Sequence, residues 1–283
     1  MKFHTVTTDE PFLRPLQNLL DPIPHLFCIG QIPAQRSNVV SIVGSRKNTS
    51  YGEAIAYQLA YDLAKKDIVV VSGLAYGIDS CAHRGCLDGG GITIAVLGTS
   101  IDNIYPRRNF RLAEEIIQRG AILSEYAPKA QLGAWSFLER NRIVAGLADA
   151  VVVVEAACRS GTLATANFAL EQGKELFAVP GDITRPMSVG CNRIIKHGAH
   201  VFTETNDILS LIAPERCTSQ KRHFRNCNPD EQKILDLLQA GVQDGDEIIT
   251  TTGLSVADFN QNITMLEINS RVRALGGNKW CII

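Results

Sequence analysis

The chain has 283 residues, of which 45% are apolar and 20% are charged, and its formal net charge is −1 at pH 7. This length is enough for at least one full hydrophobic core and predicts two domains. The balanced charge excludes a global basic field that would indicate nucleic acid from composition alone. The eight scattered cysteines form no Cys-x-x-Cys pair, and there is no signal peptide or long apolar run. We therefore expect a reduced, cytoplasmic protein that makes no membrane contact.

In chain order, residues 1–37 are short and punctuated by prolines, and they predict an extension that packs on the next domain without a core of its own. Residues 38–213 then repeat one cycle of apolar strand, glycine turn and helix. This alternation predicts an α/β domain, an extended Rossmann-like parallel sheet flanked by helices, with ligands bound beyond the carboxyl ends of the strands. The predicted strands are Val39–Val43, Ile68–Val71, Ile92–Leu97, Ala121–Ser124, Val151–Glu155, Leu176–Val179 and a short edge strand at His200–Phe202.

The stretch from Phe137 to Ala166 combines a basic helix, a buried strand and a small-residue turn. The turn Ser160-Gly161-Thr162 is predicted to open the next helix, with unpaired backbone N–H groups and the helix dipole at the edge of the sheet. Such a helix start is an anion site. Arg140 and Arg142 precede the strand and are expected to add positive charge to the same edge.

Further basic residues follow other strands. Gly44-Ser45-Arg46 leaves the first strand of the cycle, and Arg107 and Arg111 follow the third. A single arginine would equally well pair with a surface carboxylate. Several arginines and helix starts at one edge instead favour an elongated polyanion over one small phosphate. Tyr105 and Phe137 are candidates for stacking on bases, and core packing is the alternative for both.

The sequence offers little for catalysis. No Gly-x-Gly-x-x-Gly or Walker lysine loop is present, which argues against a nicotinamide or flavin cofactor and against ATP hydrolysis. Asp79, Glu125 and Glu155 are candidate acids after strands, although helix capping explains Asp79 equally well. The cluster of Cys81, His83 and Cys86 lacks a fourth metal ligand. We predict no enzyme activity, no catalytic residues, no cofactor and no bound metal.

Residues 214–283 do not continue the cycle of strand, glycine turn and helix. Residues 214–228 read as a basic linker, and 229–283 show helical periods, a cap at Ser255 and a hairpin turn at Gly276-Gly277. Three helices followed by a hairpin predict a small winged-helix domain. Its four basic and eight acidic residues give a net charge of −4. Since phosphate contacts dominate affinity for duplex DNA, we expect contact with protein or self-association instead.

Taken together, the motifs between residues 38 and 213 resemble the DNA-processing protein A family (DprA, also called Smf). The stretches that carry the resemblance are Ser41–Arg46, Ser72–Asp79, Ala82-His83, Ala95–Gly98, Tyr105-Pro106, Asn109, Leu123–Glu125, Arg140–Gly146, Val153–Glu155, Ser160–Thr162, Ala178–Gly181 and Gly190-Cys191.

This resemblance implies a domain that binds single-stranded DNA, protects incoming DNA and loads the RecA recombinase during natural transformation, usually as a homodimer. It implies that Arg46 contacts backbone phosphate, as does the basic position after Tyr105-Pro106, here Arg107 or Arg111. The helix start at Ser160-Gly161-Thr162 would line the same pocket. Many family members add an N-terminal sterile-alpha-motif domain, and residues 1–37 are too few to hold one.

Two alternatives stay open. Related Rossmann-like phosphoribohydrolases cleave nucleoside monophosphates with a glutamate three residues after a Gly-Thr pair, and the corresponding residue here is Thr165. The other alternative is a nucleotide sensor that signals through the winged helix.

Overall fold

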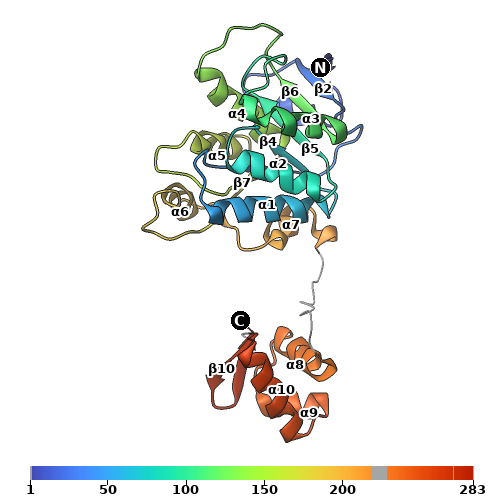
Figure 1. Cartoon of the computed structure of the whole chain (residues 1–283), viewed down its shortest axis with the longest axis vertical. Helices are drawn as coiled ribbons and strands as arrows, with labels where there is room; N and C mark the ends of the chain where they lie inside the picture. The colour runs from blue at the N-terminus through green and yellow to red at the C-terminus, as the bar shows by residue number, and fades with distance from the viewer. Residues whose placement is uncertain (1, 218–227, 270, 283) are drawn as a thin grey trace. The chain divides into compact units, whose positions relative to one another are not determined.

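The computed structural model describes residues 2–217, 228–269 and 271–282 (Figure 1). They fall into two units, Met1–Cys217 and Thr218–Ile283. Of the predicted basic linker, Pro214–Arg216 forms a short 3-10 helix (η3) in the first unit. The rest of that linker, from residue 218 to 227, lies outside the described residues.

The described part of the first unit forms a nine-stranded sheet in the order β1-β2-β6-β5-β4-β3-β7-β8-β9. The strands from β6 to β9 in this order pair in parallel, which confirms the predicted Rossmann-like sheet. Most of their bounds lie within a residue or so of the prediction. They are β3 (Val39–Val43), β4 (Val69–Ser72), β5 (Thr93–Leu97), β6 (Ala121–Ser124), β7 (Ala150–Val153), β8 (Glu175–Ala178) and β9 (His200–Val201).

The first 37 residues extend this sheet. β1 (His4–Thr7) pairs antiparallel with β2 (His25–Gly30), and β2 pairs antiparallel with β6. Between them η1 (Arg14–Asn18) buries Leu16 completely. The segment therefore shares the core of the first unit and contributes two strands, which its proline spacing did not indicate.

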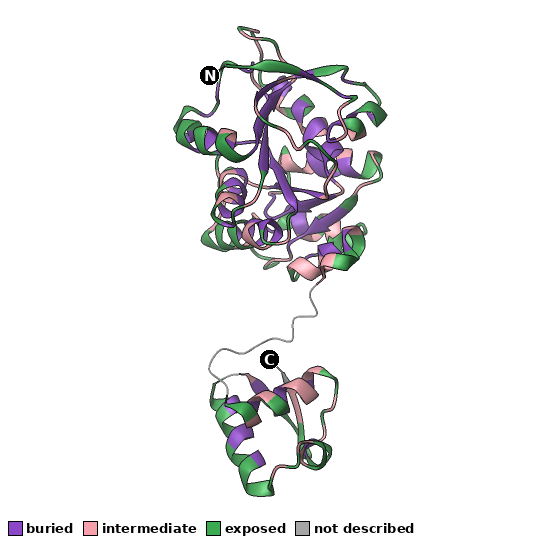
Figure 2. Cartoon of the chain, turned by 90° about the vertical axis from the view of Figure 1, so that its right-hand side faces the viewer, coloured by how far each residue is buried: buried purple, intermediate pink, exposed green. Residues whose placement is uncertain are grey.

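Helices cover both faces of the sheet, as Figure 2 shows by the buried strands between helices with exposed outer sides. Side chains along β3 point alternately to the two faces of the sheet. Val39 and Val43 belong to the core under one set of helices, and Val40 and Ile42 belong to the core under the other. One set comprises α4 (Trp135–Leu147), α5 (Thr162–Glu171) and α6 (Val189–Lys196). The other comprises α1 (Ser50–Ala64), α2 (Ile78–Asp88), α3 (Phe110–Arg119) and α7 (Thr205–Ile212).

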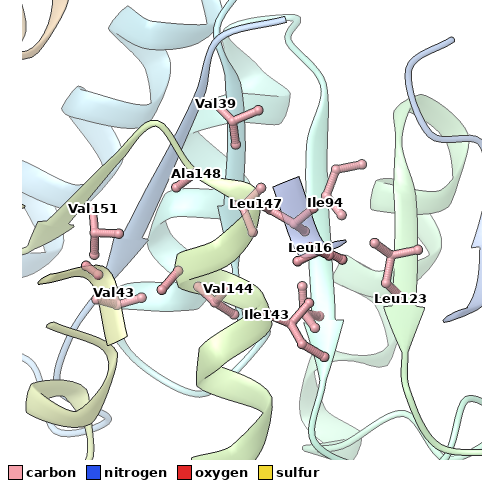
Figure 3. Packing of buried hydrophobic residues seen from close by; sticks show 14 of the residues in the cluster. Leu16, Val39, Val43, Ile94, Leu123, Ile143, Val144, Leu147, Ala148 and Val151 are labelled. Atoms are coloured by element: carbon pink, nitrogen blue, oxygen red, sulfur yellow. The ribbon is translucent and has the colours of Figure 1, made fainter. Parts of the chain in front are cut away.

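Helix α4 is the one that bears on the site described below, and Figure 3 shows how it is held. Its apolar side packs on the middle of the sheet, and Leu16 of η1 lies against the same cluster. The residues it buries there are Ile143, Val144 and Leu147, each exposed by no more than 1%. Because this side packs on the sheet, it sets the rotation of α4 about its axis. The rotation in turn decides which other residues of α4 face the site.

The second unit has three helices, α8 (Pro229–Gln239), α9 (Gly245–Thr252) and α10 (Val256–Ile268). A hairpin of β10 (Val272–Gly276) and β11 (Lys279–Ile282) follows. Ser255 caps α10 by accepting a hydrogen bond from the backbone N–H of Asp258 (3.1 Å). Gly276 and Gly277 turn the hairpin with φ angles of +90° and +58°, which glycine adopts without strain. The predicted winged helix is thereby confirmed.

Two further findings concern the described residues as a whole. None of their helices has both the length and the hydropathy that a membrane span requires. Within the same residues, no three potential metal ligands come together. His83 instead contacts Thr93 (2.7 Å), and the Cys86 thiol donates to the carbonyl of Ile92 (3.3 Å).

Candidate nucleic-acid interface

The site lies at the point in the sheet where the strand order reverses, between β3 and β7. β3 and β7 are parallel neighbours, yet the helices that follow them, α1 and α5, cover opposite faces. Diverging connections of this kind open a crevice at the carboxyl ends of the two strands. The hydroxyl of Thr162 donates to the carbonyl of Gly44 (3.1 Å), and this bond links the two connecting loops.

A cleft of about 640 Å³ opens at this point. Its lining carries four cationic side chains and one carboxylate, a net charge of +3. The predicted residues that line it are Gly44, Ser45, Arg46, Arg140, Ser160, Gly161 and Thr162. The sequence prediction missed the cations Lys47 and Arg159, although each is a chain neighbour of a predicted turn.

Arg46 is exposed at the rim and lies beside aromatic rings. Its guanidinium carbon is 5.6 Å from the centroid of the Phe137 ring, a cation–π distance. The Tyr105 ring lies 5.7 Å from that of Phe137, and 49% of Tyr105 is exposed. The Arg46 loop is held by a hydrogen bond from the backbone N–H of Ile78 to the carbonyl of Ser45 (3.3 Å). The rim therefore offers a positive charge next to an open aromatic surface.

The start of α5 differs in detail from the prediction. The N–H of Thr162 donates to the Ser160 hydroxyl (3.2 Å), and those of Leu163 and Ala164 donate to carbonyls of the preceding turn (both 3.1 Å). The turn therefore presents hydroxyl groups and the positive end of the helix dipole instead of a row of unpaired N–H groups.

Arg140 is not a surface residue. Only 4% of it is exposed, and its guanidinium donates to the carbonyls of Gly73 (2.7 Å) and Val96 at the floor of the cleft. Burial lowers the pKa of Arg140 to about 10, so it stays charged at neutral pH. A Cβ on Gly73 would lie 2.5 Å from Arg140 Nη2, which explains the glycine at this position.

Asp79 lies at the same floor and holds the loop that follows β4. Its Oδ2 accepts hydrogen bonds from the N–H groups of Gly73 (3.1 Å) and Ala75 (3.4 Å). Burial raises the pKa of Asp79, and the charge of Arg140 opposes that rise. Asn109 pins the loop from the other side by donating to the carbonyl of Leu74 (2.9 Å).

Three predicted residues lie outside the lining. Arg142 pairs with Glu125 (2.6 Å) and approaches Asp21 (3.8 Å). Residues two apart on a helix point in different directions, so α4 cannot direct both Arg140 and Arg142 at one cleft. Arg107 and Arg111 are exposed on the 3-10 helix η2 (Arg107–Asn109) and the first turn of α3. They follow Pro106, which lines a small hollow beside the cleft.

Two of the three candidate acids, Glu125 and Glu155, lie outside the cleft lining and are bonded to other residues. Glu155 accepts from the N–H (2.9 Å) and hydroxyl (2.5 Å) of Thr49, and Glu125 is paired with Arg142. Thr165, which stands where a phosphoribohydrolase would carry its glutamate, lines the cleft as a buried residue.

Residues 3–213 match the family model of DNA recombination-mediator protein A. The chain belongs to this family. Residues 225–278 match the model of the DprA winged helix domain. Both matches confirm the resemblance seen in the motifs.

Similar curated proteins include Smf of Escherichia coli, 43% identical over 74% of this chain, and a DNA processing protein DprA of Mycobacterium tuberculosis, 38% identical over 86%. The chain spans 56% and 64% of the lengths of these two family members. Among solved structures, DprA of Streptococcus pneumoniae superposes with a TM-score of 0.67 at 36% identity, covering 75% of each chain. DprA of Helicobacter pylori, described for its mode of binding single-stranded DNA, gives 0.66 at 31% identity, covering 74% of this chain and 95% of its own.

Proposed function

We propose that this family member binds single-stranded DNA in the cleft between the β3 and β7 loops. We further propose that it acts as a recombination mediator that protects incoming DNA and loads RecA during natural transformation. The observation that carries the proposal is a local charge of +3 in a cleft of a chain whose net charge is −1. The family membership and the similar Helicobacter pylori protein support it.

The rim suits a single strand better than a duplex. Arg46, Lys47 and Arg159 are cations that can reach phosphate, and Tyr105 and Phe137 offer ring faces next to them. Bases stack on aromatic side chains only where they are free of a partner strand. Arg107 and Arg111 would lengthen this contact along the same edge.

We infer binding without catalysis. Among the residues that the structure describes, Asp79 is the one carboxylate that lines the cleft, and two backbone N–H groups already bond to it. Incubation with nucleoside monophosphates tests this inference, because release of free base would establish a hydrolase instead.

For the winged helix we propose contact with protein. In helix-turn-helix proteins the recognition helix enters the major groove. Here α10 contains no lysine or arginine between Val256 and Ile268, and Asp258 and Glu267 are exposed on it. We also propose that the chain forms a homodimer, which light scattering of the full chain checks. Removing residues 218–283, which leaves the whole first unit in place, should leave affinity for single-stranded DNA within about twofold.

The direct test is the affinity for a dT oligomer across a salt series. Arg46→Ala should weaken binding and flatten the plot of log K against log salt by about 0.7, as expected for the loss of one phosphate contact on a single strand. Arg119→Ala is the matched control, since Arg119 is exposed on the last turn of α3 and lies outside the cleft lining. Absent or salt-independent binding by the wild type would refute the proposal.

The mediator role needs a separate assay. RecA assembly on a strand covered by a single-strand-binding protein should be faster with the wild-type chain than with Arg46→Ala. Equal rates for both would show that strand binding in the cleft does not load RecA.

A further inference from the structure

Glu155 is a buried carboxylate close to the cleft, two positions after the end of β7. Only 3% of it is exposed, and it is not among the described residues that line the cleft. It lines a separate hollow of about 310 Å³ instead. A strand in the cleft would not touch it, so any effect on binding must come through its charge or through the residues that it contacts.

Both carboxylate oxygens of Glu155 bond to Thr49. Oε2 accepts from the backbone N–H of Thr49 (2.9 Å), and Oε1 accepts from its hydroxyl (2.5 Å). The same hydroxyl accepts from the N–H of Gly52 (3.3 Å) and so caps α1. A Cβ on Gly52 would lie 2.4 Å from the carboxyl carbon of Glu155, which explains the glycine here. Glu155 thereby ties the start of α1 to the end of β7.

Thr49 ends the turn that carries the cations Arg46 and Lys47. At the start of this turn the carbonyl of Ser45 accepts from the N–H of Ile78 (3.3 Å). Between these two ends both cationic side chains are exposed, and neither forms an ion pair with another described residue. The place of the two cations at the cleft therefore depends on both ends of the turn being held.

We propose that Glu155 is a positioning residue for strand binding, which holds the turn of Arg46 and Lys47 through Thr49 in the conformation that contacts phosphate. This inference rests on the proposed binding of single-stranded DNA in the cleft. Without Glu155 the N–H and hydroxyl of Thr49 would lose their acceptors in a half-buried place, which is costly, so the turn would open to water. The apparent affinity then falls in proportion to the fraction of molecules whose turn is closed.

The charge of Glu155 makes the sign of the effect decisive. Removing a carboxylate beside a cleft of net charge +3 would by itself strengthen the attraction for a polyanion. Glu155→Met removes the charge and both acceptors while keeping a side chain of similar length. Positioning predicts that this variant binds about fivefold more weakly or worse, from the loss of hydrogen bonds to a charged group. An effect of charge alone predicts tighter binding.

The experiment measures the affinity of the full chain for a dT oligomer across a salt series. In Glu155→Met the plot of log K against log salt should shift downward with the slope of the wild type, because a turn that closes on the strand makes the same phosphate contacts. Arg46→Ala should flatten the slope, since it removes a contact. A titration at high protein concentration counts the active molecules, so that loss of folded protein is not taken for loss of affinity.

Asp182→Asn is the matched control. Asp182 lines the same hollow as Glu155, but it accepts from the N–H of Thr184 (2.9 Å). The variant makes the same change of charge and should bind dT at least as tightly as the wild type.

Two variants of Thr49 test the contact from its other side without changing the charge. Thr49→Val leaves Oε1 of the buried carboxylate without its donor and should weaken dT binding about as much as Glu155→Met does. Thr49→Ser keeps the hydroxyl and should bind within about twofold of the wild type.

The outcomes separate this inference from the function on which it rests. A wild-type chain that does not bind dT refutes the proposed function itself. If the wild type binds and Glu155→Met binds equally well or more tightly, that function stands and the positioning role is overturned. If Glu155→Met does not fold, the two variants of Thr49 decide, and equal affinity of Thr49→Val and Thr49→Ser overturns the positioning role.

Discussion

The first prediction concerns His83, which is fully buried on α2. The hydroxyl of Thr93 donates to the carbonyl of Val70 (2.9 Å), so in its contact with Nδ1 of His83 (2.7 Å) it is the acceptor. The proton is therefore on Nδ1, and the lone pair of Nε2 is buried without a partner among the described residues. Burial lowers the pKa of His83 from 6.5 to about 3, and the charge of Arg140 adds to the effect.

The sign of the pH effect follows from these two pKa values. Below pH 6.5 the unfolded chain binds a proton at His83 and the native chain does not, so stability falls as the pH drops, down to the native pKa of about 3. Between pH 7.5 and pH 5 the unfolded state gains about 2 kcal/mol from this one group. That figure changes little for any native pKa below about 4, because at pH 5 the native imidazole is then neutral.

The assay is unfolding in urea at pH 7.5 and at pH 5, and the fluorescence of Trp135 reports the unfolding. Replacing Trp280 by phenylalanine removes the only other tryptophan and restricts the signal to the first unit. His83→Asn keeps a polar group near the Thr93 hydroxyl and removes the titration, so about 2 kcal/mol of the pH dependence should disappear. His197→Gln, at an exposed position after α6, is the control. An unchanged pH dependence in His83→Asn would refute the assignment.

Three further expectations follow from single contacts. Arg142→Ala should lower the free energy of unfolding by about 1–2 kcal/mol through loss of its bond to Glu125, with dT affinity in fluorescence anisotropy changed less than twofold. Gly73→Ala should cost about 1–3 kcal/mol in urea unfolding and also weaken dT binding, since its Cβ would displace Arg140. Asn228→Ala removes a capping box and should cost about 1 kcal/mol, seen in the fluorescence of the second unit only.

Much of the fold could be predicted because its signals are local. The strands at Val39–Val43 and Ala121–Ser124 are apolar runs next to glycines, and the structure places them at those residues. β2 was missed because prolines precede it and its partner β6 lies far along the chain. α6 was missed because it is short and carries polar residues among its apolar ones.

In the site, too, the features that depend on neighbouring residues could be predicted, and those that depend on residues far apart in the chain could not. Gly44-Ser45-Arg46 and Ser160-Gly161-Thr162 are short motifs, so the rim could be predicted from them. The floor could not, because Arg140 bonds to residues 67 and 44 positions earlier in the chain. The misplacement of Arg142 was avoidable, since helical geometry already separates residues two positions apart.

The net charge of −1 is a poor guide to whether the chain binds DNA. It sums charges over the whole chain, and most of these lie too far from the cleft to act on a bound strand. At physiological ionic strength, exposed charges more than about 8 Å apart hardly affect each other, so a strand in the cleft responds mainly to the cations that line it. With Arg46, Lys47 and Arg159 contacting phosphate, log K against log salt should fall with a slope of about −2. Contacts from Arg107 and Arg111 as well would steepen it to about −3.5. The measured slope therefore counts the phosphates held and decides whether those two arginines belong to the binding surface.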